Sequence, residues 1–361
     1  MRTGNYKESV GQVIALSDSK AAWAWTAALI AALIVAPYWV GAYALTLMVS
    51  ALIAVIGAVG LNLLTGTTGL ISLGQAGFLA VGAYTNAILL TDYHLPVWVS
   101  LPAAGVAGAL VSIVVGIPSL RLKGLYLAIT TLAFAFIINH IILYAERLTH
   151  GPNGVFVTGA KLFGFGLQRG PALYYLTLAL AVATIFAALN LLRTRIGRAW
   201  IAIRDHDIAA RVMGIDLVRY KLLAFVVSSF IVAIAGALLS LQIRFVNIDV
   251  FALILSIEAL AIIILGGLGS VAGAVLGAVF LSYLLEAIRL ALSTVIDSSS
   301  PLYTNYVYEI RGIANGLVIV LFLRFKSDGL IGFGGMRANI GAIGRWPTDN
   351  RRPRLTKGGH K

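Results

Sequence analysis

The chain has 361 residues, of which 60% are hydrophobic and only 11% are charged, and its formal net charge is +13. So few charged residues cannot cover the surface of a soluble domain of this length, and the composition therefore predicts a polytopic membrane protein. The absence of cysteine excludes disulfides and thiolate metal sites.

Apolar runs long enough to form membrane-spanning helices follow one another along most of the chain. A membrane crossing needs about 17–25 residues, and every expected span except the last is close to this length or within it. In chain order we expect spans at Ala21–Val40, Tyr43–Leu64, Leu70–Leu90, Leu95–Pro118, Leu125–Tyr144, Ala172–Leu192, Tyr220–Leu241, Phe251–Leu265, Leu268–Leu290 and Ile310–Leu323. The predicted fold is an all-α membrane protein with about ten transmembrane helices.

Polar stretches flank and interrupt this membrane domain. Residues 1–20 are predicted to be a cytoplasmic lead-in, residues 21–325 the transmembrane domain, and residues 326–361 a basic, disordered tail that can contact anionic lipid. The stretch from 145 to 171 is too polar to span, and its GPNG sequence at Gly151–Gly154 indicates a turn.

The expected third span mixes glycines with polar side chains, which favours close helix packing or contact with a passage. A second glycine-rich run, Leu265–Val279, has a similar texture in the other half of the chain and suggests a two-half architecture. Candidate residues for lining a passage are Asn62, Ser72, Gln75, Thr130, Thr131, Ser256 and Glu258. Each of these side chains could instead join neighbouring helices.

Glu258 is the only acidic residue well inside an expected span. A carboxylate there is a functional candidate, because a charge in lipid costs at least about 2.5 kcal/mol. The alternative is a structural hydrogen bond, for example to Ser256. Glu286 and Arg289 lie one turn apart near a span end and are predicted to form a local pair. The five histidines have no metal-ligand spacing, so no metal site is predicted.

The longest charged stretch between two spans is Arg193–Lys221, which we call the basic segment. It contains seven basic residues and three acidic ones, and basic residues in short loops are retained in the cytoplasm. Asp205 and Asp207 suit the start of a short helix with one apolar face, and Gly214 suits its left-handed end. Such a helix either docks a soluble partner or rests on the lipid surface.

Basic residues are distributed unevenly between the two sides that this topology predicts. With ten crossings and a cytoplasmic basic segment, both termini lie in the cytoplasm, and 21 of the 27 basic residues face that side. Membrane topology thus accounts for the net charge, and no nucleic-acid partner is predicted.

The sequence Ile208-Ala209-Ala210-x-x-x-Gly214 resembles the E-A-A-x-x-x-G coupling motif of ABC importer permeases. An isoleucine stands where the motif has glutamate, and Asp207 precedes it. Further blocks resemble the LivM-like branch of these permeases in the family's order, over about residues 45–290: GLNLLTGTTGLISLGQAGFLAVGAY from Gly60, LRLKGLYLAITTLAFAFI from Leu120, GPNGV from Gly151, RYKLLAFVVS from Arg219 and SIEALAIIILGGLGSVAGAVLGA from Ser256.

The resemblance implies a multi-pass permease subunit of a bacterial inner-membrane importer for branched-chain and other hydrophobic amino acids. It implies a second, LivH-like permease subunit, two ABC ATPase subunits that bind ATP and Mg, and a periplasmic substrate-binding protein. The residues implied to contact an ATPase are Asp207, Ile208, Ala209, Ala210, Arg211 and Gly214. The chain itself would bind no cofactor and catalyse no reaction.

Other functions remain open at this stage. Relatives with similar membrane blocks suit urea, amides or aromatic acids. An ion-coupled secondary transporter should carry more intramembrane acids or bases than the one clear case here. An intramembrane enzyme would need a nucleophile and base or a metal cluster, and the sequence contains no phosphate-binding GxxxxGK[ST] loop.

Overall fold

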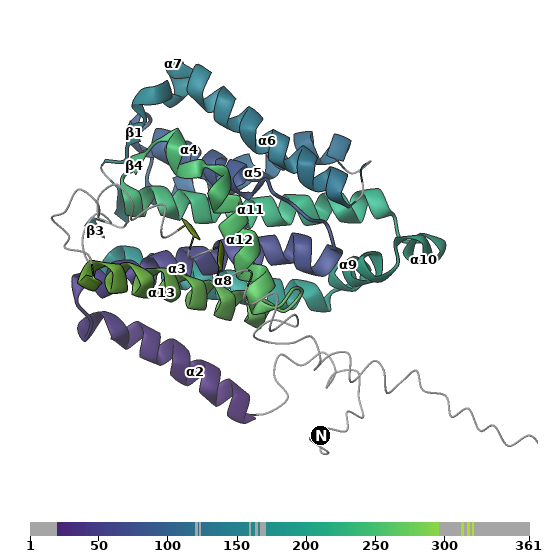
Figure 1. Ribbon diagram of the computed structural model, residues 1–361, viewed down its shortest axis with the longest axis horizontal. Coiled ribbons are helices and arrows are strands. Elements are labelled where there is room, and N and C mark those ends of the chain that lie inside the picture. Colours follow the sequence, from purple (N-terminus) through teal and green to yellow (C-terminus); the bar gives the residue numbers. More distant parts are fainter. Residues whose placement is uncertain are drawn as a thin grey trace, which may run out of the picture.

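The computed structural model describes residues 20–119, 122, 124–158, 160–162, 165–166, 171–295, 312–313, 316–317 and 320. Its helices are α2 (Lys20–Val35), α3 (Ala42–Leu61), α4 (Gln75–Thr91), α5 (Val97–Ser119), α6 (Leu125–Tyr144), α7 (Glu146–Thr149), α8 (Pro171–Arg193), α9 (Arg195–Asp205), α10 (Asp207–Val212), α11 (Leu217–Ile243), α12 (Leu253–Gly266) and α13 (Val271–Val295). The axes of α3, α5, α8, α11 and α13 lie roughly parallel to one another, and α12 crosses them steeply (Figure 1).

The described helices agree with the predicted membrane fold. Nine of the ten expected spans coincide with a helix. Six of the described helices are long and apolar enough to cross a membrane unaided, whereas α12 and the Ala24–Tyr38 part of the chain form shorter apolar helices. The expected tenth span, Ile310–Leu323, lies almost entirely outside the described residues, as does the whole C-terminal tail.

Helix α11 is the centre of the bundle and packs against α3, α4 and α5. Small residues bring α4 and α11 into backbone contact. A Cβ atom added at Gly82 would overlap the backbone of Ala233, and one added at Gly236 would overlap the backbone of Leu79. Because lipid drives helix association less than water does, such close packing supplies much of the attraction between these helices.

The expected third span, Leu70–Leu90, is helical only from Gln75 onward. Helix α3 continues into a five-residue π-helix, η2 (Asn62–Gly66), and after Thr68 the chain returns without helical structure to the start of α4. Hydroxyl groups satisfy backbone donors at this break: Leu73 N–H donates to Thr131 Oγ1, and Ala76 N–H donates to Ser256 Oγ, each at 2.9 Å. The later helix start is therefore held by neighbouring helices.

The end of the molecule opposite α10 carries short strands. Strands β1 (Val155–Phe156) and β4 (Phe245–Val246) pair antiparallel, and β2 (Lys161–Leu162) pairs with β3 (Phe165–Gly166). The GPNG turn is confirmed as a 3₁₀ turn, η3 (Gly151–Asn153). The chain between α6 and α8 is thus a small non-spanning structure at this end.

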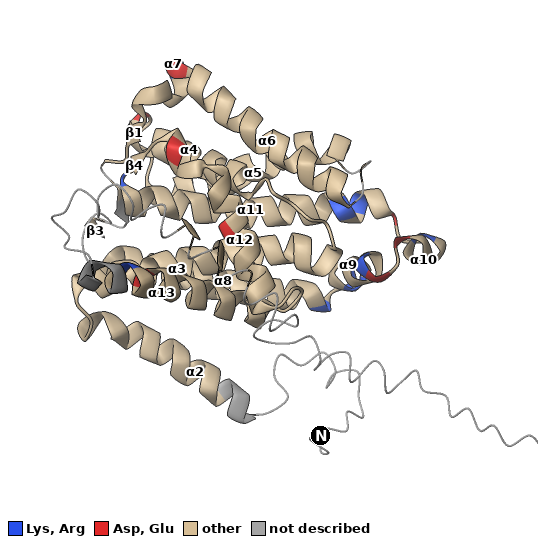
Figure 2. Ribbon diagram, viewed as in Figure 1, with Lys and Arg blue, Asp and Glu red and all other residues tan. Residues whose placement is uncertain are grey.

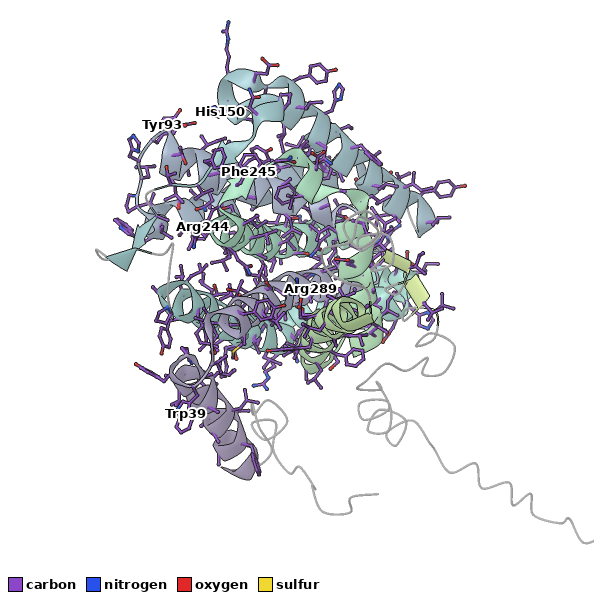
Figure 3. All side chains as sticks on the ribbon, turned by 60° about the vertical axis from the view of Figure 1, so that its left-hand side comes forward. Trp39, Tyr93, His150, Arg244, Phe245 and Arg289 are labelled. Carbon is purple, nitrogen blue, oxygen red and sulfur yellow. The ribbon has the colours of Figure 1, made fainter. Side chains whose placement is uncertain are left out.

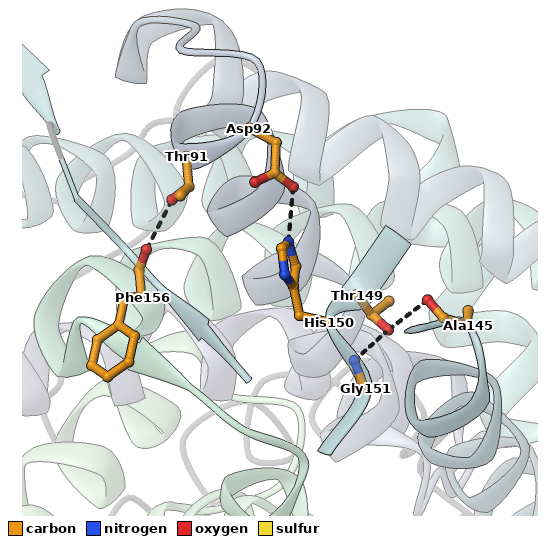
Figure 4. A network of polar contacts seen from close by, with 7 residues as sticks. All are labelled: Thr91, Asp92, Ala145, Thr149, His150, Gly151 and Phe156. Carbon is orange, nitrogen blue, oxygen red and sulfur yellow. Dashed lines mark hydrogen bonds and ion pairs between the residues drawn. The ribbon is translucent and has the colours of Figure 1, made fainter. Parts of the chain in front are cut away.

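Two side-chain contacts tie this small structure to the end of α4. Thr91 Oγ1 donates to the Phe156 carbonyl at 2.9 Å, and His150 Nε2 lies 3.2 Å from Asp92 Oδ2 (Figure 4). Phe245 stacks on Phe156 with ring centroids 4.6 Å apart. Figure 3 shows His150 and Phe245 in the same region of the molecule as Tyr93 and Arg244. These contacts fix the chain between α6 and α8 against the bundle.

Among the described residues, lysine and arginine lie mainly at the α9–α10 end of the molecule (Figure 2). At the opposite end the predicted local pair is confirmed: Arg289 Nε lies 2.8 Å from Glu286 Oε1, and the Tyr43 hydroxyl joins them. Glu258 lies half-buried on α12, within the bundle.

Candidate functional site

The basic segment forms two helices, α9 and α10, where the sequence predicted one short helix. Helix α9 is amphipathic, so packing on the bundle stabilises its apolar face. The Thr194 hydroxyl caps its first turn by accepting the Ile196 N–H at 3.2 Å. Gly197 allows a tight turn out of α8, because a Cβ there would overlap the Leu192 backbone. Helix α9 is thus held directly against the C-terminal end of α8.

Trp200 is the main anchor of α9. Its side chain is fully buried, and its Nε1–H donates to the Tyr220 carbonyl at 2.9 Å. Ile203, one turn later, is buried in a small cluster with Ala210 and Leu217. This cluster joins α9, α10 and the start of α11, so the three helices form one packed unit.

Helix α10 begins after a sharp bend at His206, whose backbone is extended. Asp207 lies in its first turn, as predicted, where a carboxylate interacts favourably with the helix dipole. Gly214 ends it with a φ of +84°, which confirms the predicted left-handed residue. Asp216 then caps α11 by accepting the Val218 N–H at 3.1 Å. Asp205, which was expected with Asp207 at the start of this helix, instead ends α9, whereas the other predicted borders are close to those observed.

The outward face of α10 is apolar and exposed. The exposed fractions of Ile208, Val212 and Met213 are 74%, 81% and 84%, whereas Ala210 on the opposite face is buried. We call these three exposed residues the α10 apolar face. Beside it lies a shallow hollow of about 70 Å³ lined by Asp207, Ile208, Arg211 and Leu217. Large apolar side chains so exposed on a short, braced helix are typical of a docking surface.

A second contact joins the basic segment to the membrane helices. Arg204 Nη1 donates to the Gly66 carbonyl at the end of η2. Gly69, at a φ of +73°, lets the chain pass close to the Arg204 side chain, 3.4 Å from where a Cβ would lie. No local sequence pattern distinguishes Arg204 from the other basic residues of the segment, because its partner is a carbonyl 138 residues away.

Most of the predicted passage residues meet around the start of α4. Gln75 Nε2 donates to the Gly57 carbonyl at 3.1 Å, and Asn62 Oδ1 accepts from the Gly269 N–H at 2.9 Å. Ser72, Thr131 and Ser256 are buried beside them. Gln75, Asn62, Thr131 and Ser256 bond to other segments of the chain, as the structural alternative predicted, whereas Ser72 accepts the N–H of nearby Gly74. Their contribution to a passage stays a prediction.

Two of the predicted passage residues stand apart from this group. Thr130 is only partly buried, and its hydroxyl donates to the Tyr126 carbonyl of its own helix at 2.9 Å. Glu258 is half-buried on α12. A different buried cluster, which sequence reasoning missed, consists of Asn86, Ser100 and Ser240 on α4, α5 and α11. Its members lie in separate spans, so only packing brings them together.

Within the described residues, six helices that are long and apolar enough to cross a membrane, with the short exposed helix α10 at one end, define a multi-pass helical membrane protein. Residues 43–323 match the family described as "branched-chain amino acid transport system / permease component", and the chain belongs to this family. No solved structure matches it.

Individual relatives agree with the family. The chain is 36% identical to the high-affinity branched-chain amino acid transport system permease protein LivM of Salmonella typhimurium over 277 residues, with the same figures for LivM of Escherichia coli. The match covers 70% of this chain, and the chain spans only 65% of the length of those proteins. A probable LivH permease protein of Methanocaldococcus jannaschii is 29% identical over 276 residues, which are 72% of this chain and 85% of that protein.

Proposed function

We propose that the chain is a membrane-spanning permease subunit of an ATP-driven importer of branched-chain and other hydrophobic amino acids. Family membership and the names of the LivM relatives support the substrate class. The chain forms half of the translocation passage, and a second, LivH-like permease subunit forms the other half. ATP and Mg bind to two partner ATPase subunits, and a periplasmic binding protein delivers the amino acid.

The observation that carries this proposal is the α10 apolar face. Two large apolar side chains of this six-residue helix, Ile208 and Val212, and that of Met213 directly after it are exposed, while Ala210 is buried on the opposite face. Leaving them in water is unfavourable by about 25 cal/mol per Å² of apolar surface, and a partner's cleft removes that penalty. Asp207 and Arg211 beside this face supply polar contacts at its rim.

The orientation follows from charge. The seven basic residues of the basic segment lie at the α9–α10 end, which we place in the cytoplasm of a bacterium's inner membrane. Both termini then lie in the cytoplasm as well. The opposite end, with η3 and the β1–β4 pair, faces the periplasmic binding protein.

Coupling between ATP use and the passage requires the ATPases to bind two conformations of this chain with different affinities. Helix α11 is the direct route, because it starts at Leu217 in the small packed cluster and crosses the centre of the bundle. Gln75, Thr131 and Glu258 remain the side chains we expect beside the passage.

The test is to reverse the polarity of the α10 apolar face in the assembled transporter. Ile208→Asp with Met213→Asp should weaken ATPase association at least about tenfold, since a few apolar residues carry most of an interface's free energy. Copurification of the ATPase subunits and ATP-dependent leucine uptake into proteoliposomes are the measurements. Leu148→Asp is the matched control for ATPase copurification, because Leu148 is 56% exposed on α7 at the end opposite to the proposed ATPase contact.

Two results would contradict the proposal. One is unchanged ATPase association and uptake in the double variant. The other is uptake that stops when an ion gradient is collapsed while ATP is held constant, which would favour a secondary transporter. Uptake of urea, an amide or an aromatic acid in place of leucine would keep the docking role and replace the substrate.

A further inference from the structure

The polar contacts of Arg204 continue past η2 into the turn between α12 and α13. Gly66, whose carbonyl accepts from Arg204, is packed so tightly that a Cβ there would overlap both Asn62 Oδ1 and the backbone nitrogen of Gly269. Asn62 Oδ1 accepts the Gly269 N–H at 2.9 Å. Three segments that are far apart in sequence therefore meet within one set of contacts.

The π-helix is the central element of this set. A π-turn within an α-helix leaves backbone groups with altered partners and is frequent at functional sites. Here it lies at the end of α3 that α9 touches (Figure 1). Asn62 is completely buried, yet its Nδ2 has no hydrogen-bond partner within the described part of the chain. A buried amide nitrogen left unbonded is unfavourable, and it can gain a partner if the turn rearranges.

The turn after α12 connects these contacts to the start of α4. Gly266 and Gly273 approach so closely that added Cβ atoms would overlap each other's backbone, which fixes α12 against α13. Helix α12 also carries Ser256, whose hydroxyl accepts the Ala76 N–H at the start of α4. This hydrogen bond links α12, and with it the Gly269 turn at the end of α12, to the first turn of α4.

We propose that Arg204 is a positioning residue that couples the basic segment to η2, the α12–α13 turn and the start of α4. This route is separate from α11, and its role in transport rests on the function proposed above. When α9 and α10 move together, the Arg204 guanidinium moves the Gly66 carbonyl. Asn62 then transfers that movement to Gly269, because the three groups are in direct contact.

Amide hydrogen exchange on the full chain in lipid nanodiscs tests the contacts without any partner. Arg204→Gln should speed exchange of the peptide containing Gly269 about tenfold, the effect of losing one charge-assisted hydrogen bond. Arg198→Gln is the matched control, because Arg198 is exposed on the same helix. Exchange that rises only within α9 and α10 would overturn the proposal.

Asn62→Ala provides a second, independent variant. It should itself speed exchange at Gly269, and in its background Arg204→Gln should have no further effect there, because Asn62 is the link between the two. Additive effects of the two substitutions would contradict the proposed route.

A transport measurement separates this proposal from the docking role. In the complete transporter, Arg204→Gln should retain ATPase copurification. It should lower the rate of ATP-dependent leucine uptake about tenfold, because the charge-assisted hydrogen bond to the Gly66 carbonyl is removed. Arg204→Lys should recover part of the uptake, since lysine can still donate to this carbonyl. Loss of copurification in Arg204→Gln would show that Arg204 acts through docking and would refute the coupling role. Failure of the α10 variants to affect copurification would instead refute the docking proposal and leave the exchange test valid.

Discussion

Helices α9 and α10 are neighbours in the basic segment and have similar mixtures of apolar and basic residues, yet they use their apolar side chains in opposite ways. Helix α9 buries Trp200 and Ile203 against the bundle, whereas α10 exposes Ile208 and Val212, and Met213 directly after it is exposed as well. A six-residue helix is too short to be stable by itself. The comparison indicates that α9 is the anchor and α10 the presented surface, which depends on the anchor for its shape.

The largest expected effect is on the anchor. Trp200→Ala removes a fully buried indole and its hydrogen bond to Tyr220, and should lower the free energy of unfolding by about 3–5 kcal/mol. Denaturant unfolding in mixed micelles measures it. Ile201→Ala, a neighbour that is 37% exposed, is the control and should change stability by less than about 1 kcal/mol. Equal effects of the two variants would show that α9 is no anchor.

Substitution of Gly214, at the end of α10, is expected to destabilise the protein less than Trp200→Ala. Gly214→Ala meets no atom within 4 Å, so its cost of about 1–2 kcal/mol is the strain of the left-handed backbone alone. Gly214→Asn should cost less, because asparagine tolerates this conformation. Limited proteolysis within α10 is the measurement, since the strain loosens this helix and leaves α9 in place. Equal cleavage of wild type, alanine and asparagine variants would argue against the backbone effect.

The smallest effects belong to the joint between α10 and α11. Asp216→Ala should cost about 1 kcal/mol through loss of the helix cap. Arg219→Ala should cost only about 0.2–1 kcal/mol, because its 3.0 Å ion pair with Asp216 is exposed. Asp216→Asn keeps the capping oxygen and should resemble Arg219→Ala. An asparagine variant as unstable as the alanine variant would assign the effect to the ion pair instead.

The sequence was informative wherever a local pattern had a single physical meaning. Apolar runs predicted nine of the described helices, because a chain in lipid must satisfy its backbone internally. Gly214 and the Gly151–Gly154 turn were also predicted correctly, since glycine has access to backbone conformations that other residues avoid. The apolar pattern of residues 208–213 predicted a helix with one apolar face.

Tertiary packing decided what local patterns could not. The apolar side chains Trp200 and Ile203 of α9 are buried, whereas Ile208 and Val212 of α10 are exposed, because only the apolar face of α9 lies against the bundle. The start of α4 at Gln75, five residues later than expected, depends on the Thr131 and Ser256 hydroxyls of other helices. Sequence by itself determined which segments enter the membrane and which segment is charged. The contacts of Arg204, Gly66, Asn62 and Gly269 exist only in the folded chain, because they join residues separated by more than a hundred positions.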